Sequence, residues 1–185
     1  MTLVEYANLI LGFLTVLGQI IIILSVVYFF FFKNKLQPVK DFISKNGVLF
    51  AFIVALTATL GSLFYSEIAG YQPCVLCWYQ RIFMYPEVIL LGTALWKKDK
   101  SIINYSITLS IIGALIAFYH YLIQIGVVEG VACGVAGYTV SCAKIFVLVF
   151  GYIGLPLMAL TAFLLIITSL LFAKFTRSNN FAEQN

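Results

Sequence analysis

The chain has 185 residues, of which 63% are hydrophobic and only 10% are charged, and its mean hydropathy is +1.06. Soluble domains carry about a quarter charged residues, so this composition excludes an ordinary water-soluble globular protein and indicates an integral membrane protein. The formal net charge of +4 is small and the sequence contains no basic stripe, so nothing in it points to nucleic acid binding.

Five apolar stretches are each long enough to cross the roughly 30 Å of membrane hydrocarbon, which predicts five membrane-spanning helices. In chain order they are about Ala7–Phe32, Val48–Tyr65, Trp78–Trp96, Ile102–Val127 and Ile145–Ala173. The first stretch has no basic segment before it and is longer than the apolar region of a signal peptide. We therefore expect it to be a retained helix rather than a cleaved signal.

The fifth stretch is too long for one straight span. It is interrupted by Gly151, Gly154 and Pro156. We expect its first third to lie at the membrane interface, and the crossing helix to include Leu157 and the residues after it.

Basic residues are distributed unevenly between the two ends of these predicted helices. Nine of the eleven lie between spans one and two, between spans three and four, or after span five: Lys33, Lys35, Lys40, Lys45, Lys97, Lys98, Lys100, Lys174 and Arg177. Only Arg81 and Lys144 belong to the opposite side. The positive-inside rule then predicts an outside N-terminus and a cytoplasmic C-terminus. Both loops that contain cysteine would face outward, where disulfides form and persist.

A Cys-x-x-Cys motif, formed by Cys74 and Cys77, follows Pro73 and precedes an apolar stretch. Because proline suits the first turn of a helix, we expect the motif to open the third helix with both sulfurs on one face. The unpaired N–H groups of a first turn stabilise a thiolate, the nucleophile in disulfide exchange. Arg81 falls on the same face one turn deeper, where an anionic partner such as a thiolate would offset its cost. This pattern predicts a redox-active dithiol where lipid meets water.

Cys133 and Cys142 form a second pair in a later outer loop that is rich in glycine. Two alternatives to redox chemistry stay open. One is a non-enzymatic membrane scaffold with structural disulfides, although a two-residue spacer closes almost no loop entropy. The other is a zinc site with four cysteine ligands, although the eight residues between Cys133 and Cys142 are unlike a zinc knuckle. A dithiol relay across the membrane would need further cysteines in the membrane-spanning segments or on the cytoplasmic side, and the chain has none there.

The segment 74–81, with the order Cys-Val-Leu-Cys-Trp-Tyr-Gln-Arg, resembles the signature of the bacterial disulfide bond formation protein B family, which comprises quinone-coupled membrane thiol oxidases. Supporting matches are His120 with Gln124, and the Cys-Ala pair that begins at Cys142. The resemblance covers about residues 45–173. Vitamin K epoxide reductase homologues are related, but in them the loop pair precedes the Cys-x-x-Cys motif.

The resemblance implies an all-α integral membrane protein with a four-helix transmembrane bundle as its core. Residues 1–46 would be an extra N-terminal transmembrane helix with a cytoplasmic loop, 47–173 the core, and 174–185 a cytoplasmic tail. The expected location is the bacterial cell membrane. The extra helix and the short loop from Val128 to Lys144 depart from the family pattern.

The resemblance also implies a path for electrons. Cys133 would form a mixed disulfide with a thioredoxin-fold extracytoplasmic thiol oxidase, and Cys142 would then bond to Cys74. Cys77, released as a thiolate, would interact with a membrane quinone, either ubiquinone or menaquinone. Arg81 would stabilise the resulting negative charge.

Three further polar residues lie in the predicted spans. The resemblance places His120 and Gln124 near the quinone, although the tyrosines that flank His120 would also fit an aromatic interfacial belt. Glu87 is costly inside the third span and does not share a face with Arg81, so we expect its partner on another helix or its carboxyl to be protonated.

Overall fold

The computed structural model describes the backbone of residues 2–31, 37–99, 101–129 and 140–182, and the side chains of these residues except 29–45 and those after 174. The helices, in chain order, are α1 (Leu3–Phe31), α2 (Gln37–Leu63), α3 (Val75–Lys97), α4 (Ile102–Gln124) and α5 (Leu155–Ala182). One turn of π-helix, η1 (Phe64–Ile68), extends α2. Within these described residues the only β-type pairing is an isolated bridge between Val149 and Ile153. The predicted all-α fold is confirmed.

Four segments of the described chain are long and apolar enough to span a membrane: Leu3–Tyr28, Asn46–Ile68, Ile102–Gln124 and Leu155–Lys174. Helix α3 matches the length of α4 at 23 residues but is not among them. Its polar side chains, which include Gln80, Arg81 and Glu87, lower its hydropathy.

The four helices α2 to α5 form a closed bundle, since α2 packs on α3, α3 on α4, α4 on α5 and α5 on α2. Their shared core consists of buried side chains from all four helices, including Ala55, Leu91, Ala117 and Ile166. Gly113 of α4 faces the buried ring of Phe163 on α5, and a side chain at this position would collide with that ring. Small residues thus let the helices approach closely, as they do in membrane bundles generally.

The fifth apolar stretch is divided as its glycines and proline predicted. Residues 145–154 are not helical, and the backbone turns at Phe150 and Gly151, which have φ of 52° and 79°. Helix α5 begins only at Leu155, so Pro156 lies in its first turn, where a proline costs no hydrogen bond.

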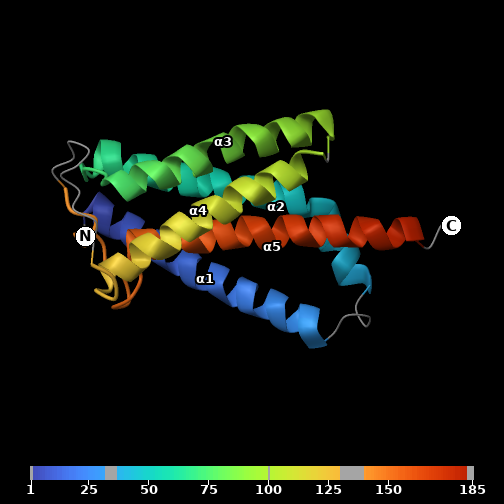
Figure 1. Cartoon of the computed structure of the whole chain (residues 1–185), viewed down its shortest axis with the longest axis horizontal. Helices are drawn as coiled ribbons and strands as arrows, with labels where there is room; N and C mark the ends of the chain where they lie inside the picture. The colour runs from blue at the N-terminus through green and yellow to red at the C-terminus, as the bar shows by residue number, and fades with distance from the viewer. Residues whose placement is uncertain (1, 32–36, 100, 130–139, 183–185) are drawn as a thin grey trace.

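Helix α1 lies outside the four-helix bundle and packs mainly on α5 (Figure 1). In Figure 1 it lies close to the bundle near the N-terminus and diverges from it toward Phe31. The N-terminus, the α2–α3 connection and the α4–α5 connection lie at one end of the molecule, and the C-terminus lies at the other. Both cysteine-containing connections therefore share an end with the N-terminus.

Candidate functional site

The first cysteine pair stands at the start of α3. Cys74 is the N-cap residue, with extended backbone angles (φ −73°, ψ 173°), and the helix begins at Val75. The motif therefore opens the third helix as predicted, with Pro73 just before the cap rather than inside the first turn. The Sγ atoms of Cys74 and Cys77 lie 3.2 Å apart. This distance is longer than the roughly 2.05 Å of a disulfide, so the pair is a dithiol in hydrogen-bond contact.

The two thiols have different environments. Cys74 is buried, with 2% of its surface exposed, whereas Cys77 is partly exposed. The hydrogen bond from Cys74 to Cys77, together with burial, raises the pKa of the Cys74 thiol to about 12. Cys74 therefore holds its proton at neutral pH and donates it toward Cys77. The sulfur of Cys77 is the acceptor, which makes Cys77 the better candidate for the thiolate.

His120 of α4 connects the two cysteine loops. Its Nε2 atom lies 3.7 Å from the Sγ of Cys74 and 3.1 Å from the carbonyl oxygen of Cys142, and its Nδ1 lies 3.0 Å from the amide nitrogen of Gln80. If that amide donates to Nδ1, then Nε2 carries the hydrogen and donates to the Cys142 carbonyl. The imidazole is buried, and its contacts with Cys74 and with the Cys142 carbonyl hold the second loop against the first.

Cys142 lies beside the first pair, in a buried cluster with Cys74 and Ile123. A small cavity at this point is lined by Cys74, Cys77, Cys142, His120 and Gln124, among others. The structure thus brings three of the four predicted cysteines together with both predicted α4 residues. Cys133, the fourth, lies outside the described residues.

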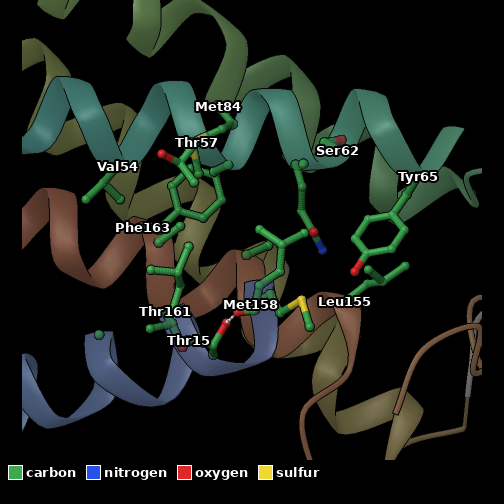
Figure 2. Close-up of a pocket in the computed structure, with 18 of the residues that line it drawn as sticks. Thr15, Val54, Thr57, Ser62, Tyr65, Met84, Leu155, Met158, Thr161 and Phe163 are labelled. Atoms are coloured by element: carbon green, nitrogen blue, oxygen red, sulfur yellow. Dashed lines mark hydrogen bonds between the residues drawn. The ribbon is translucent and has the colours of Figure 1, made fainter. Parts of the chain in front are cut away.

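A larger cavity of about 380 Å³ begins on the other side of Cys77. It lies between α1, α2, α3 and α5, and Figure 2 shows part of its lining. Of the three described cysteines, only Cys77 lines it, and Arg81 lines it as well. The residues that line it do not include His120 or Gln124, which lie on the Cys74 side of the motif. Its volume falls within the range of small-molecule sites.

Arg81 is held in the wall of this larger cavity. Its Nε and Nη2 atoms donate to the hydroxyl and carbonyl oxygens of Ser62 on α2, at 3.0 and 3.1 Å. The guanidinium lies over the ring of Trp78, with its carbon 5.1 Å from the ring centroid. Tyr85 also donates to the Ser62 hydroxyl, at 3.2 Å. These contacts fix a permanent positive charge one helical turn from Cys77.

Sequence reasoning missed two residues of the site. Ser62, a small residue of the second predicted span, is the hydrogen-bond acceptor that orients Arg81. Gln80 carried no predicted role, yet it is buried and hydrogen-bonded to His120. The available signal for Gln80 was an amide inside an apolar span, which needs a partner.

Glu87 of α3 is fully buried, and its partners lie on another helix, as expected. Both of its oxygens accept hydrogen bonds from α4, one from Ser106 and the other from Ser110 at 2.9 Å. These three residues are buried between α3 and α4, and they join the two helices at a point farther along α3 than the cysteine motif.

The zinc alternative has a geometric counterpart in the described residues. One ligand atom each from Cys74, Cys77 and His120 lie within 4.8 Å of one another. However, the Nε2 atom of His120 already faces the carbonyl of Cys142. The same three groups suit thiol chemistry, in which a histidine lies next to an exchanging sulfur.

Comparisons with known proteins agree on one family. The family model described as "Disulfide bond formation protein DsbB" matches residues 44–173. The chain is 51% identical over 122 residues to the SPbeta prophage-derived disulfide bond formation protein B of Bacillus subtilis, covering 66% of this chain and 81% of that one. It is 45% identical over 127 residues to the disulfide bond formation protein C of the same organism, covering 66% and 91%. A probable disulfide formation protein C 1 of Bacillus cereus is 50% identical over 109 residues, covering 59% and 78%. No solved structure matches.

Proposed function

The chain belongs to the DsbB family of disulfide bond formation proteins, and on this premise we propose that it is a membrane thiol:quinone oxidoreductase. In this proposal it reoxidises a secreted thioredoxin-fold dithiol oxidase and passes the electrons through two cysteine pairs to a membrane quinone. The observation that carries the proposal is the position of Cys77. Its sulfur contacts Cys74 on one side and lines the large cavity on the other.

The second cysteine pair receives the electrons. A thiolate of the partner attacks Cys133 of a Cys133–Cys142 disulfide, which forms a mixed disulfide and releases the Cys142 thiolate. Cys142 then attacks Cys74 of the oxidised first pair and releases Cys77 as a thiolate. Cys142 and Cys74 belong to one buried cluster and line the same small cavity, which supports this step. The partner's second thiol resolves the mixed disulfide, so the partner leaves as a disulfide.

The first pair delivers the electrons. The Cys133 thiolate attacks Cys142 of the Cys74–Cys142 disulfide, which restores the second pair and leaves Cys74 as a thiol. The Cys74–Cys77 dithiol then holds the two electrons and two protons taken from the partner. A bound quinone supplies an acceptor for both, and a disulfide is restored between Cys74 and Cys77. Cys77 is the sulfur that such an acceptor can reach, because it lines the large cavity.

Arg81 and His120 support this transfer from opposite sides of the motif. Arg81 provides a fixed cation at the cavity wall, where it stabilises negative charge on Cys77 or on the acceptor. His120 lies against Cys74 and the Cys142 backbone, so it positions the two sulfurs that must exchange. The predicted quinone-binding role of His120 and Gln124 stays a prediction, because neither residue lines the large cavity. Both side chains line the small cavity next to Cys77.

Redox magnitudes explain why an acceptor stronger than an ordinary disulfide is needed. Structural disulfides have potentials below about −300 mV, whereas a strongly oxidising thioredoxin-fold protein lies near −120 mV. The difference of roughly 180 mV opposes oxidation of the partner by about 8 kcal/mol. A membrane quinone can supply this driving force.

The membrane arrangement follows from the charge distribution. Nine of the eleven basic residues lie between spans one and two, between spans three and four, or after span five. We propose that the N-terminus and both cysteine loops face the extracytoplasmic side of the bacterial cell membrane, and that the C-terminus is cytoplasmic.

A zinc site is a second candidate, which the clustered ligand atoms of Cys74, Cys77 and His120 favour. It predicts protection of both thiols by the metal. Disulfide exchange instead predicts thiols of unequal reactivity, and the alkylation experiment in the Discussion separates the two.

A covalent trap tests the order of the exchange steps. If Cys133 is the partner-facing cysteine, Cys142→Ser should accumulate a mixed disulfide when the Cys133 thiolate attacks the disulfide of the oxidised thioredoxin-fold partner, because the Cys142 thiol that would displace the partner and re-form the Cys133–Cys142 bond is missing. The complex should disappear under reductant on a gel. The double variant Cys133→Ser/Cys142→Ser is the control and should form none. Absence of a reductant-sensitive complex in Cys142→Ser would show that the proposed order is wrong.

A further inference from the structure

The large cavity extends far beyond the cysteine motif. Its lining on α2 runs from Ser62 to Phe50, and its lining on α1 runs from Leu11 to Ile21. At 1.5 Å per residue, these stretches correspond to about 15–18 Å along the helices. The cavity is therefore an elongated channel along the helices, and it is partly open to the surface, since Leu17 and Ile53 in its lining are exposed.

The two ends of this channel differ in polarity. Hydroxyl, amide and guanidinium groups gather near Cys77, where the lining includes Ser62, Tyr65, Gln80 and Arg81. The far end is lined mainly by aliphatic and aromatic side chains, including Leu17, Ile21, Phe50, Ile53 and Leu165. In Figure 2, Val54 and Thr57 of α2 and Thr15 of α1 lie on facing sides of this region. The occupant that fits has a polar head at Cys77 and a long apolar tail.

Helix α1 forms one wall of the channel and is fixed to the bundle by specific contacts. Tyr65 donates to the Asn8 side chain at 2.9 Å, and Tyr152 donates to the Gln19 side chain at 3.1 Å. Gly18 lies so close to α5 that a Cβ atom there would be 2.8 Å from the Leu165 side chain. Polar bonds and close backbone packing are the usual means by which membrane helices associate.

We propose that α1, with the facing surfaces of α2 and α5, binds the isoprenoid tail of the quinone along this channel. This inference rests on the proposed function and adds a role for the extra N-terminal helix, which lies outside the region matched by the family model. The quinone ring lies at Cys77 and Arg81, and the tail runs along α1 toward Ile21. The protein then favours long-tailed quinones over tail-less ones through contacts that the four-helix core alone does not supply.

Bulky substitutions far from the sulfurs test the proposal. Thr57→Phe on α2 and Leu17→Trp on α1 would fill the channel without touching the motif. We expect each to raise KM for a long-tailed quinone about tenfold, equivalent to about 1.4 kcal/mol, and to leave KM for a tail-less quinone unchanged. Matched controls are Thr108→Phe and Leu24→Trp. Both parent residues are exposed and do not line the channel, and Thr108 bonds its own helix as Thr57 does.

The kinetic results separate this inference from the proposed function. If the unmodified protein reduces neither quinone in the presence of reduced partner, the proposed function fails. If it reduces both but the two channel variants match their controls, only the tail site is wrong. Equal KM increases for long-tailed and tail-less quinones would also overturn the tail site, because the substitutions would then act on the ring or the fold.

A crosslinking measurement on the unmodified protein does not depend on how the variants fold. A long-tailed quinone with a photoreactive group near the end of its tail should label residues 11–21 or 50–58, and excess unlabelled long-tailed quinone should displace it. Labelling confined to the exposed face of α4 would overturn the proposal. Channel labelling that phospholipid displaces and quinone does not would assign the channel to a lipid acyl chain and would overturn it as well.

Discussion

At the scale of single residues, the site depends on an asymmetry between two sulfurs that are three positions apart. Cys74 is buried at the N-cap of α3, in contact with His120 and beside Cys142. Cys77 is more exposed and lines the large cavity. One sulfur therefore faces the exchange partner and the other faces the proposed acceptor. In the proposed mechanism, this division gives the Cys-x-x-Cys motif a direction for electron flow.

The asymmetry predicts unequal alkylation of the reduced pair. The Cys74 pKa of about 12 is raised above the ordinary cysteine value of about 8.5, so its neutral thiol persists through pH 8 and ionises only near pH 12. In a Cys133→Ser/Cys142→Ser background, iodoacetamide at pH 8 should modify Cys77 well before Cys74, as measured by mass spectrometry. Equal rates would contradict the thiol assignment. Protection of both cysteines that a chelator removes would favour the zinc site.

Arg81 supplies charge rather than thiol chemistry. Arg81→Ala should raise KM for quinone about tenfold or more, in line with the roughly 1.5–3 kcal/mol of a hydrogen bond to a charged group. Exchange between Cys74 and Cys142 should be largely retained. Arg81→Lys should recover activity only in part, because lysine lacks the planar fork that engages Ser62. If the KM for quinone is unchanged in Arg81→Ala, then Arg81 only anchors α3 to α2 and does not act on the quinone.

At the scale of helices, the lengths of the apolar stretches and the positions of proline and glycine predicted most of the elements. Proline before Cys74 indicated the start of α3, and Gly151, Gly154 and Pro156 indicated the break before α5. The start of α2 was expected near Val48, but the helix begins at Gln37. The apolar pattern marks only the part of a helix that suits lipid, so polar turns beyond it carry no such signal.

Contacts between helices were harder to predict, because they depend on which faces meet. The free-energy cost of a carboxyl group in the membrane indicated that Glu87 has a buried partner. Nothing in the sequence identified Ser106 and Ser110 as that partner. Nothing in the sequence distinguishes Ser62 from other small residues, and only the packing of α3 on α2 places Arg81 against it. The position of α1 along the large cavity had no signal in the sequence either, because its apolar residues suit lipid and protein equally well.

At the scale of the whole molecule, the termini and connections are arranged as a membrane redox protein requires. The N-terminus and both cysteine-containing connections lie at one end of the bundle (Figure 1). In the proposed function this end meets the soluble partner, while the channel beside α1 lies among the helices that could span the membrane. The electron path from partner to quinone is then short and lies entirely at this end.

Cysteine labelling checks the sidedness of this arrangement. In a variant without native cysteines, single cysteines at Asn46 and Asp99 should resist a membrane-impermeant thiol reagent in intact cells, because the positive-inside rule places them in the cytoplasm. A cysteine at Gly137 should be labelled. Labelling of the Asp99 position from outside would show that the orientation is the reverse of the proposed one. The cysteines would then not lie in an oxidising compartment.

The central claim is that the protein couples oxidation of a partner dithiol to reduction of a quinone, and anaerobic stoichiometry tests it most directly. Purified protein would be mixed with a reduced thioredoxin-fold oxidase and either ubiquinone or menaquinone, and partner disulfide and quinol would be quantified together. The account predicts one quinol for each partner disulfide, and neither product with Cys77→Ser. Partner oxidation without quinol, or no oxidation with either quinone, would contradict it.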